Sequence, residues 1–207
     1  MDAARHPLKV TVYSDYICPF CYVGDRRLRR LAERFPLDIT WRPVEIHPET
    51  PPEGMPLERL GYPPEVWEKM MAHLGNMAAE EGIALAERHF TTNSHNALLL
   101  AEAARELGEE VFGRVHEGLF HAFFCEGRNI GEAAVLADIA VRAGMAREAF
   151  DRALADPRHE DALRENFVSA RQDGVTGVPT LVINGHRVQG AVPLANLLLL
   201  AEELVEG

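Results

Sequence analysis

Apolar and polar side chains alternate over residues 8–13, and this period of two predicts a strand with one buried face. From residue 21 to residue 35 the apolar positions instead recur every three or four residues, which is typical of an amphipathic helix. Pro36 ends that helix, and residues 39–42 then resemble a second strand. The order strand, helix, strand predicts a β-α-β unit with a parallel strand pair.

A segment rich in proline and glutamate at residues 43–61 predicts a loop, and a long region of helical periodicity follows it. Near its end, Asp156-Pro157 interrupts the helical pattern. The sequence predicts six helices here: one opened by Pro63-Pro64, one capped by Ser94, and four over residues 111–124, 132–143, 147–154 and 160–173.

The strand pattern returns at residues 180–183 and 186–189, separated by Asn184-Gly185. Asn-Gly between two strand-like segments is a strong signal for a tight β-hairpin. A last helix is predicted from Pro193 through Leu204. The chain therefore reads β-α-β, a helical block, one more helix and β-β-α, which predicts an α/β fold.

The composition limits the classes of partner. Of the 207 residues 47% are hydrophobic, enough for a packed core, and 32 acidic against 21 basic residues leave a net charge of −11. This balance argues against non-specific binding to nucleic acid or to anionic membranes. We therefore expect no nucleic-acid partner and no membrane partner.

Targeting and cysteine usage favour a cytoplasmic location. Residues 1–7 are polar and contain no apolar core of a secretory signal, and the aliphatic run at 197–201 is too short to span a bilayer. Three cysteines are few for a fold stapled by disulfides. In a reducing compartment a Cys-x-x-Cys pair is more often catalytic or metal-binding than structural.

The candidate chemistry lies in Cys18-Pro19-Phe20-Cys21, at the start of the first predicted helix. The partial positive charge of a helix N-terminus favours a thiolate at Cys18, and Cys21 lies one turn further on the packed side. This predicts an accessible attacking thiol and a shielded resolving thiol. A redox pair is favoured over half of a zinc site, because no second Cys-x-x-Cys and no His-x₃-His completes four ligands. Inert core cysteines are a further alternative.

A second motif, Val178-Pro179-Thr180, begins the third predicted strand. Together with the cysteine motif it resembles the DsbA-like thioredoxin superfamily, and most of all its FrnE-like cytoplasmic branch, which is related to 2-hydroxychromene-2-carboxylate isomerases and kappa-class glutathione transferases. The segments that carry the resemblance are SDYICPFCYVG at 14–24, WRP at 41–43, EGRNIG at 126–131 and GVTGVPT at 174–180.

The resemblance implies a thioredoxin fold with an inserted all-helical domain. Residues 1–55 and 160–207 would form the thioredoxin-like domain, and residues 56–159 the inserted helical domain. It also implies a cis peptide bond before Pro179, which would face the cysteines and offer the backbone of Val178 to an extended substrate.

By the same resemblance the chain is a thiol–disulfide oxidoreductase, with Cys18 as nucleophile and Cys21 as resolving thiol. The expected substrates are protein or low-molecular-weight thiols and disulfides. No metal and no resident cofactor are expected, and glutathione is a candidate co-substrate. The oligomeric state stays open. The supporting and substrate-binding positions would be Pro19, Phe20, Val178, Pro179 and Thr180.

Two departures from the family pattern matter. Some members carry a second cysteine pair near the C-terminus, whereas this chain has no cysteine after Cys125. The related isomerases and transferases usually have serine at the position of Cys18. Two alternatives stay open: a glutathione-dependent isomerase or transferase, and a non-catalytic binding or holdase module on the same scaffold.

Several other side chains are weaker candidates. Asp15 or Glu45 could resemble the acidic group that accepts the resolving thiol's proton in thioredoxin-like proteins. His95 and Asn96 could line a cleft, although a role in helix capping is the plainer interpretation. His121 and Cys125 have the spacing of metal ligands, but the phenylalanines around them favour core packing.

Two groups of side chains allow either a structural or a functional interpretation. Methionines 70, 71 and 77, together with Trp67, could form an adaptable apolar wall, but helical spacing of this kind more often means core. The arginines at positions 26, 27, 29, 30 and 34 are predicted to form a solvated helix face.

Overall fold

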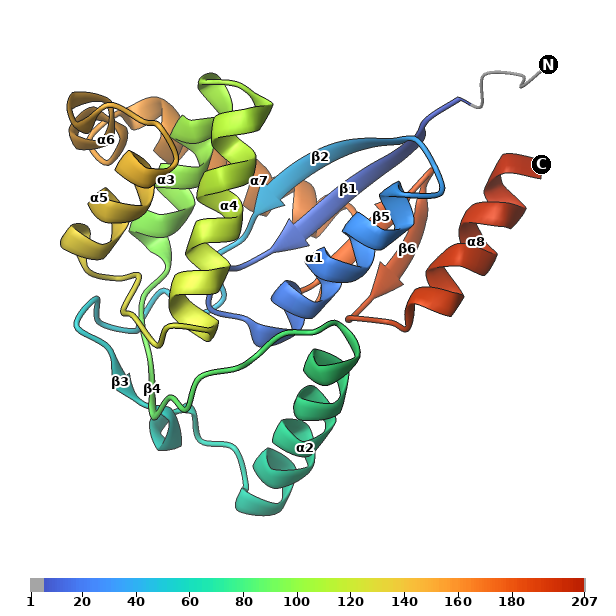
Figure 1. Cartoon of the computed structure of the whole chain (residues 1–207), viewed down its shortest axis with the longest axis horizontal. Coiled ribbons are helices and arrows are strands. Elements are labelled where there is room, and N and C mark those ends of the chain that lie inside the picture. Colours follow the sequence, from blue (N-terminus) through green and yellow to red (C-terminus); the bar gives the residue numbers. More distant parts are fainter. Residues whose placement is uncertain (1–5, 207) are drawn as a thin grey trace.

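A four-stranded mixed sheet organises the chain. The computed structural model describes residues 6–206, so residues 1–5 of the polar leading segment lie outside the described residues. β1 lies at the centre, parallel to β2 and antiparallel to β5, and β6 continues the hairpin at the edge (Figure 1). The strands are β1 (Leu8–Ser14), β2 (Leu37–Pro43), β5 (Thr180–Ile183) and β6 (His186–Gln189).

Helices cover both faces of this sheet. α1 (Pro19–Ala32) and α8 (Leu194–Glu206) pack together over one face, where Val10, Val12 and Leu28 belong to one buried cluster. α7 (Pro157–Gln172) packs on the other face, where the Tyr13 hydroxyl donates to Asp173 Oδ2 at 2.6 Å. Alternate side chains of β1 therefore pack against helices on opposite faces of the sheet.

The remaining helices are inserted between β2 and β5. α3 to α6 form a compact group, whereas α2 lies beside α1 and away from that group (Figure 1). One buried cluster joins α3 to α6 with the start of α1 and with Leu74, Met77 and Ala78 of α2. The helices are α2 (Pro64–Glu80), α3 (His95–Glu106), α4 (Glu109–Phe124), α5 (Ala133–Arg142) and α6 (Arg147–Ala153). The predicted order of β-α-β, helices and β-β-α is confirmed. The division into residues 1–55 with 160–207 and residues 56–159 stays a prediction.

The insertion also contains a short irregular part that the periodicity did not predict. β3 (Met55–Pro56) pairs antiparallel with β4 (Phe90–Thr91), and the 3₁₀ helix η1 (Leu57–Leu60) follows β3. Two-residue strands are too short to leave a detectable alternation in a sequence.

The predicted break at Asp156-Pro157 is confirmed, since α6 ends at Ala153 and α7 begins at Pro157 rather than at the predicted Glu160. The Asp156 side chain accepts a hydrogen bond from the backbone N–H of Arg158, and Pro157 occupies the first turn.

The capping prediction for Ser94 is corrected. Ser94 precedes α3 but makes no side-chain cap. The backbone N–H of His95 donates instead to Asn93 Oδ1 at 2.8 Å.

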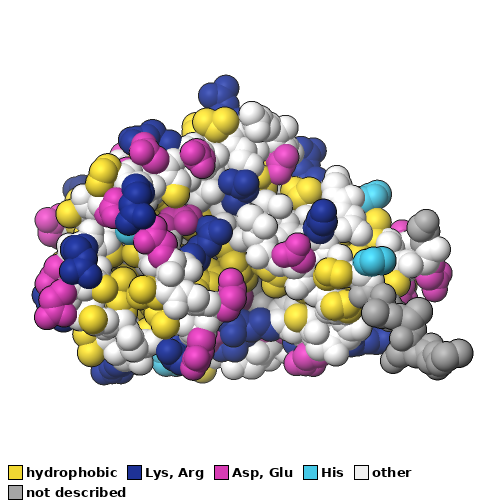
Figure 2. Space-filling view, turned by 90° about the horizontal axis from the view of Figure 1, so that it is seen from above, with side chains coloured by type: hydrophobic (Ala, Val, Ile, Leu, Met, Phe, Trp, Pro, Cys, Tyr) yellow, Lys and Arg dark blue, Asp and Glu magenta, His cyan; other side chains and the backbone are white. Residues whose placement is uncertain are grey.

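The prediction of a solvated arginine face on α1 is wrong for Arg27. Its side chain is only 2% exposed and donates to Glu80 and Glu81, both at 2.8 Å. These ion pairs connect α1 to the C-terminal end of α2. Elsewhere the charges are mixed: Figure 2 shows acidic and basic side chains interspersed on one face of the molecule. Within residues 6–206, no helix is both long and apolar enough to cross a membrane.

Candidate active site

The cysteine motif forms the start of α1. Cys18 is the N-cap residue, with extended backbone angles of φ −90° and ψ 114°, and Pro19 occupies the first turn where no N–H is needed. The backbone N–H of Cys21 donates to Cys18 O at 3.0 Å, so the two cysteines are one turn apart. The sequence prediction that the motif opens this helix is confirmed.

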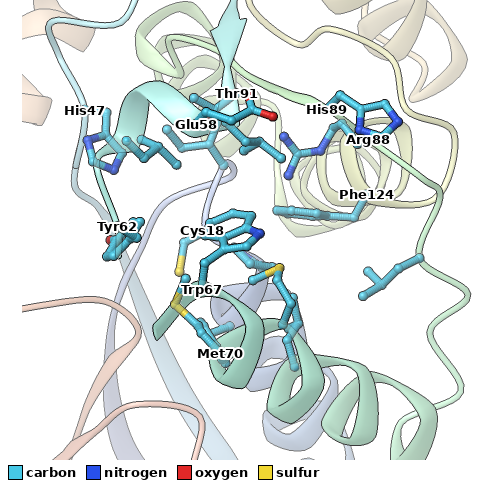
Figure 3. A pocket seen from close by; sticks show the side chains of 18 of the residues that line it. Cys18, His47, Glu58, Tyr62, Trp67, Met70, Arg88, His89, Thr91 and Phe124 are labelled. Atoms are coloured by element: carbon cyan, nitrogen blue, oxygen red, sulfur yellow. The ribbon is translucent and has the colours of Figure 1, made fainter. Parts of the chain in front are cut away.

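The two thiols differ in their surroundings. Both are free, but Cys18 is 7% exposed and lines a pocket, whereas Cys21 is 1% exposed and does not (Figure 3). Burial raises the pKa of the Cys21 thiol well above its ordinary value, and the adjacent Cys18 thiol raises it further. Cys21 Sγ accepts one buried backbone hydrogen bond, from Asp15 N at 3.5 Å. The structure therefore has one thiol at the pocket and one shielded thiol.

The second motif lies against the first although 160 residues separate them. The Cys18 thiol donates to the carbonyl oxygen of Val178 at 3.6 Å, and the Val178–Pro179 peptide bond is cis. Thr180 is buried, and its hydroxyl donates to Gly177 O at 2.7 Å. A Cβ at Gly24 would lie 3.3 Å from Pro179 Cγ, so a glycine in α1 permits this close approach.

Phe20 lies between two hollows. It lines the large pocket that contains Cys18 and also a smaller one beside Val178 and Pro179. All seven predicted site positions are thus brought together at one end of α1. They are Cys18, Pro19, Phe20, Cys21, Val178, Pro179 and Thr180.

Asp15 is the carboxyl group beneath the motif. Its oxygens accept hydrogen bonds from Ile17 N at 3.2 Å, Ile46 N at 2.9 Å and the Ser94 hydroxyl at 3.0 Å. Burial raises its pKa to about 6, because these three donors only partly replace the water that an ionised carboxylate loses. Asp15 and Glu45 were the two acidic candidates in the sequence. Asp15 is the one that contacts Cys21, through its backbone N–H.

Glu45 has a different set of partners. It accepts hydrogen bonds from Asn93 at 2.9 Å and pairs with His95 at 3.2 Å, and His95 also meets Glu160 at 2.7 Å. Burial lowers the pKa of His95, but the bonds to Glu160 and Glu45 outweigh it and leave the pKa raised. His95 joins the loop after β2 to α3 and α7, and it does not line the pocket.

The pocket beside Cys18 is large and mostly apolar. Its volume is about 760 Å³, within the range of pockets that hold small molecules. Trp67, Met70 and Met71 of α2 line it, so the interpretation of these residues as core is corrected. Met77 is buried and lines the smaller hollow beside Pro179. A face of α2 that buries a pocket has the same helical period as one that buries a core.

Within the described part of the chain, no group of three or more His, Cys, Asp or Glu side chains is arranged so that it could hold a metal ion. His121 is exposed and lies near Glu126, and Cys125 Sγ lies 3.9 Å from the Tyr22 hydroxyl. The phenylalanines at positions 120, 123 and 124 are buried, as the sequence predicts.

Sequence reasoning missed a buried polar chain next to the motif. His116 of α4 is 3% exposed and joins the Tyr16 hydroxyl, at 2.9 Å, to Asp25 Oδ1, at 3.1 Å. Its partners are 100 and 91 residues away in the sequence, and no local pattern connects them. These hydrogen bonds connect Tyr16, before the cysteine motif, and Asp25, after it, to α4.

Known proteins share this arrangement. Residues 9–200 match the DSBA-like thioredoxin domain family. YwbO of Bacillus subtilis (strain 168) is 28% identical over 189 residues, which cover 88% of this chain and 90% of YwbO.

Two solved structures are similar over nearly the whole chain. The probable DsbA oxidoreductase SCO1869 from Streptomyces coelicolor is 28% identical, has a TM-score of 0.84 and covers 95% of this chain and 89% of its own. The cytosolic disulfide reductase DsbM from Pseudomonas aeruginosa, solved with GSH, is 19% identical, has a TM-score of 0.68 and covers 95% of this chain and 99% of its own. The second similarity concerns the fold alone.

The chain belongs to the DSBA-like thioredoxin family, and it has the predicted α/β thioredoxin fold with inserted helices. Membership supports thiol–disulfide oxidoreductase chemistry in the broad sense.

Proposed function

We propose that this DSBA-like protein exchanges disulfides through a Cys18–Cys21 pair, with Cys18 as nucleophile and Cys21 as resolving thiol. The observation that carries the proposal is the asymmetry of the two thiols: Cys18 lines the pocket, and Cys21 is buried one helical turn behind it. An exchange centre needs one sulfur that substrate can reach and a second that only the first can reach.

In the reducing direction the Cys18 thiolate attacks one sulfur of a substrate disulfide. A mixed disulfide forms, and the first substrate thiolate leaves. Cys21 then attacks Cys18 Sγ, the mixed disulfide breaks and the second substrate thiolate leaves. Two electrons pass from the protein to the substrate, and the protein retains a Cys18–Cys21 disulfide. The oxidising direction is the reverse.

The second step requires that Cys21 lose its proton. Its raised pKa makes the free thiolate scarce at neutral pH, so a nearby base accelerates the step. Asp15 suits this role, because its backbone N–H bonds Cys21 Sγ and its carboxyl has a pKa of about 6, so that it is mostly ionised at pH 7. The same N–H stabilises the thiolate once it forms.

Val178 and Pro179 form the opposite wall. The Val178 carbonyl that now accepts from Cys18 would accept from the backbone of an extended substrate, and Thr180 holds the turn through Gly177. Pro19 and Phe20 add apolar surface beside the reacting sulfur. No resident cofactor takes part. Glutathione is a candidate co-substrate, and the cytoplasm is the proposed compartment.

The test is disulfide exchange with glutathione and the reduction of insulin, for the wild type and for Cys18→Ser. We expect the wild type to catalyse both and Cys18→Ser to catalyse neither. Cys125→Ser is the matched control and should behave as the wild type. A wild-type protein inactive in both assays would overturn the proposal.

The same variant separates the alternatives. A glutathione-dependent isomerase or transferase retains its activity in Cys18→Ser, because serine is usual at that position in the related enzymes. A holdase retains its suppression of aggregation when Cys18 and Cys21 are both replaced. Disulfide exchange is lost in each case.

A further inference from the structure

The pocket beside Cys18 contains one permanent positive charge. Of the described residues that line it, only Arg88 is an arginine or lysine. Arg88 lies in the segment between α2 and β4, and its guanidinium turns into the pocket above Phe124, across from Met70 and Trp67 (Figure 3). A cation and a reactive sulfur therefore share one cavity.

This guanidinium has apolar and neutral partners. It donates to the carbonyl oxygen of Phe90, and it lies 4.1 Å from the ring centroid of Phe123 and 5.4 Å from that of Phe124. Among residues 6–206 no carboxylate is in ion-pairing distance of it, unlike Arg27 with its two glutamates. Burial lowers the pKa of Arg88 to about 10, and no negative charge compensates.

The other ionisable residues of the pocket do not neutralise Arg88. Glu58 is exposed, and Glu87 is 86% exposed and lies 3.2 Å from His89. His47 lines the pocket and lies 3.3 Å from Glu49, which does not line it. These groups belong to the solvated rim. A partly desolvated cation without a counter-ion is costly, and an incoming anion recovers much of that cost.

The rest of the pocket is suited to an apolar body. Trp67, Met70, Met71 and Phe124 provide aromatic and thioether surface, and both types of side chain adapt to flat apolar groups. A volume of about 760 Å³ exceeds that of a single side chain and suits a small molecule.

From this juxtaposition we propose that the substrate is a low-molecular-weight disulfide with an apolar, preferably aromatic, body and a carboxylate that binds Arg88. The inference rests on the proposed exchange at Cys18. The carboxylate pairs with the guanidinium while the apolar body lies against α2, and this places the disulfide at Cys18. Arg88 is a binding residue and takes no part in electron transfer.

The reaction balances with one substrate molecule. Cys18 attacks one sulfur of the aryl disulfide and releases one aryl thiolate. Cys21 attacks Cys18 Sγ, releases the second aryl thiolate and gives its proton to Asp15. The protein loses two electrons, and the substrate disulfide gains them.

The experiment compares two aryl disulfides on the reduced full-length protein: dithiobis-nitrobenzoate, which carries carboxylates, and uncharged dithiodipyridine. For each disulfide, the second-order rate constant of its single-turnover reaction with the reduced protein is measured. The proteins compared are the wild type, Arg88→Met, Arg88→Lys and the control Arg59→Met, which removes an exposed arginine from η1 outside the pocket lining. The rate constant for the carboxylated disulfide is divided by that for the uncharged one, and this ratio is compared between the variants and the wild type, which cancels the intrinsic reactivities of the two disulfides.

We expect Arg88→Met to lower that ratio about tenfold to hundredfold, the usual value of one charge-assisted hydrogen bond. Arg88→Lys should restore part of it, and Arg59→Met should leave it unchanged. A ratio in Arg88→Met within about twofold of the wild-type ratio overturns the inference. If the wild type reacts with neither disulfide through Cys18, the proposed function itself fails.

A measurement on the wild type does not depend on how Arg88 variants fold. Naphthoate, which has a carboxylate and no sulfur, should inhibit exchange at least tenfold more tightly than the uncharged naphthamide. Equal inhibition contradicts a carboxylate site. If only carboxylated peptide disulfides depend on Arg88, the occupant is a peptide and the small-molecule assignment is wrong.

Discussion

Helices α1 and α2 form two sides of the same pocket but are held in very different ways. α1 buries eight of its 14 residues, whereas α2 buries three of its 17. α1 packs against α8 and the sheet, while α2 is joined to α1 through Arg27 with its two glutamates and through Leu74, Met77 and Ala78. The proposed reacting sulfurs therefore lie on a tightly packed element, and the apolar wall of the pocket lies on a helix with few buried residues.

This division suits the two tasks. The proposed exchange between Cys18 and Cys21 needs a fixed geometry, and the buried part of α1 around Cys21 to Asp25 supplies it. Recognition of apolar substrates tolerates movement, and a helix with few buried contacts is expected to open at a lower free-energy cost than the core. Variants in the two helices should therefore separate chemistry from binding.

Removing the resolving thiol is expected to have the largest effect. Cys21→Ser should lower steady-state turnover at least hundredfold, because no thiol of the protein then attacks Cys18 Sγ to cleave the mixed disulfide. The first step should survive, so one equivalent of substrate thiolate is released and the adduct is detected on Cys18 by mass spectrometry. Unchanged turnover would show that Cys21 is not the resolving group.

Breaking the connection between the two helices comes next. Arg27→Met leaves Glu81, which is 2% exposed, without its buried partner, and the free energy of unfolding should fall by about 3–5 kcal/mol. Arg30→Met is the matched control, because the half-exposed Arg30 also pairs with Glu81 and should cost less than about 1 kcal/mol.

The two variants are compared by urea denaturation and by amide hydrogen exchange. In Arg27→Met, exchange should accelerate over residues 64–80 more than over residues 19–32. Equal losses of stability in Arg27→Met and Arg30→Met would contradict a buried link between α1 and α2.

A third test uses the pH dependence of Asp15 below α1. The pKa of Asp15 in the folded protein is raised to about 6, so its protonated carboxyl stabilises the folded state. This contribution is complete at a pH below the pKa of Asp15 in the unfolded chain, and it is lost as the pH rises through 6. The loss is at most about 3 kcal/mol. The unfolding free energy of the wild type should therefore fall relative to Asp15→Asn between pH 4 and pH 8.

Kinetics provides a second readout for the same variant. In the wild type the step resolved by Cys21 should accelerate as Asp15 ionises near pH 6. Asp15→Asn should lack this inflection and resolve more slowly at pH 7. An identical pH profile in both proteins would exclude Asp15 as the proton acceptor.

The smallest effect is expected from the apolar wall. Trp67→Ala should raise KM for an aryl disulfide about tenfold, while unfolding free energy changes by less than about 1 kcal/mol because the indole is only half-buried. Val66→Ala, at an exposed neighbouring position outside the lining, should change neither quantity. A large loss of stability in Trp67→Ala would mean that α2 is a core element after all.

The sequence predicted the features that depend on local pattern. The alternation in β1, the helix after Cys18 and the Asn184-Gly185 hairpin are all visible over a few residues. The approach of Val178 to Cys18 was accessible only through the family resemblance, since 160 residues separate the two.

The rest depended on contacts that a single sequence does not encode locally. Arg27 has the same spacing as its solvated neighbours, and its burial is decided by Glu80 and Glu81 from another helix. Arg88 lies in a segment without periodicity, and its position at the pocket follows from the aromatic rings of α4.

Redox titration of the wild-type protein against glutathione buffers, followed by mass spectrometry of alkylated peptides, tests the central claim most directly. A Cys18–Cys21 pair predicts one two-electron transition, with both thiols lost together as an intramolecular disulfide and Cys125 still free. Separate titration of Cys18 and Cys21 as glutathione adducts, or no reaction at Cys18, would contradict the account.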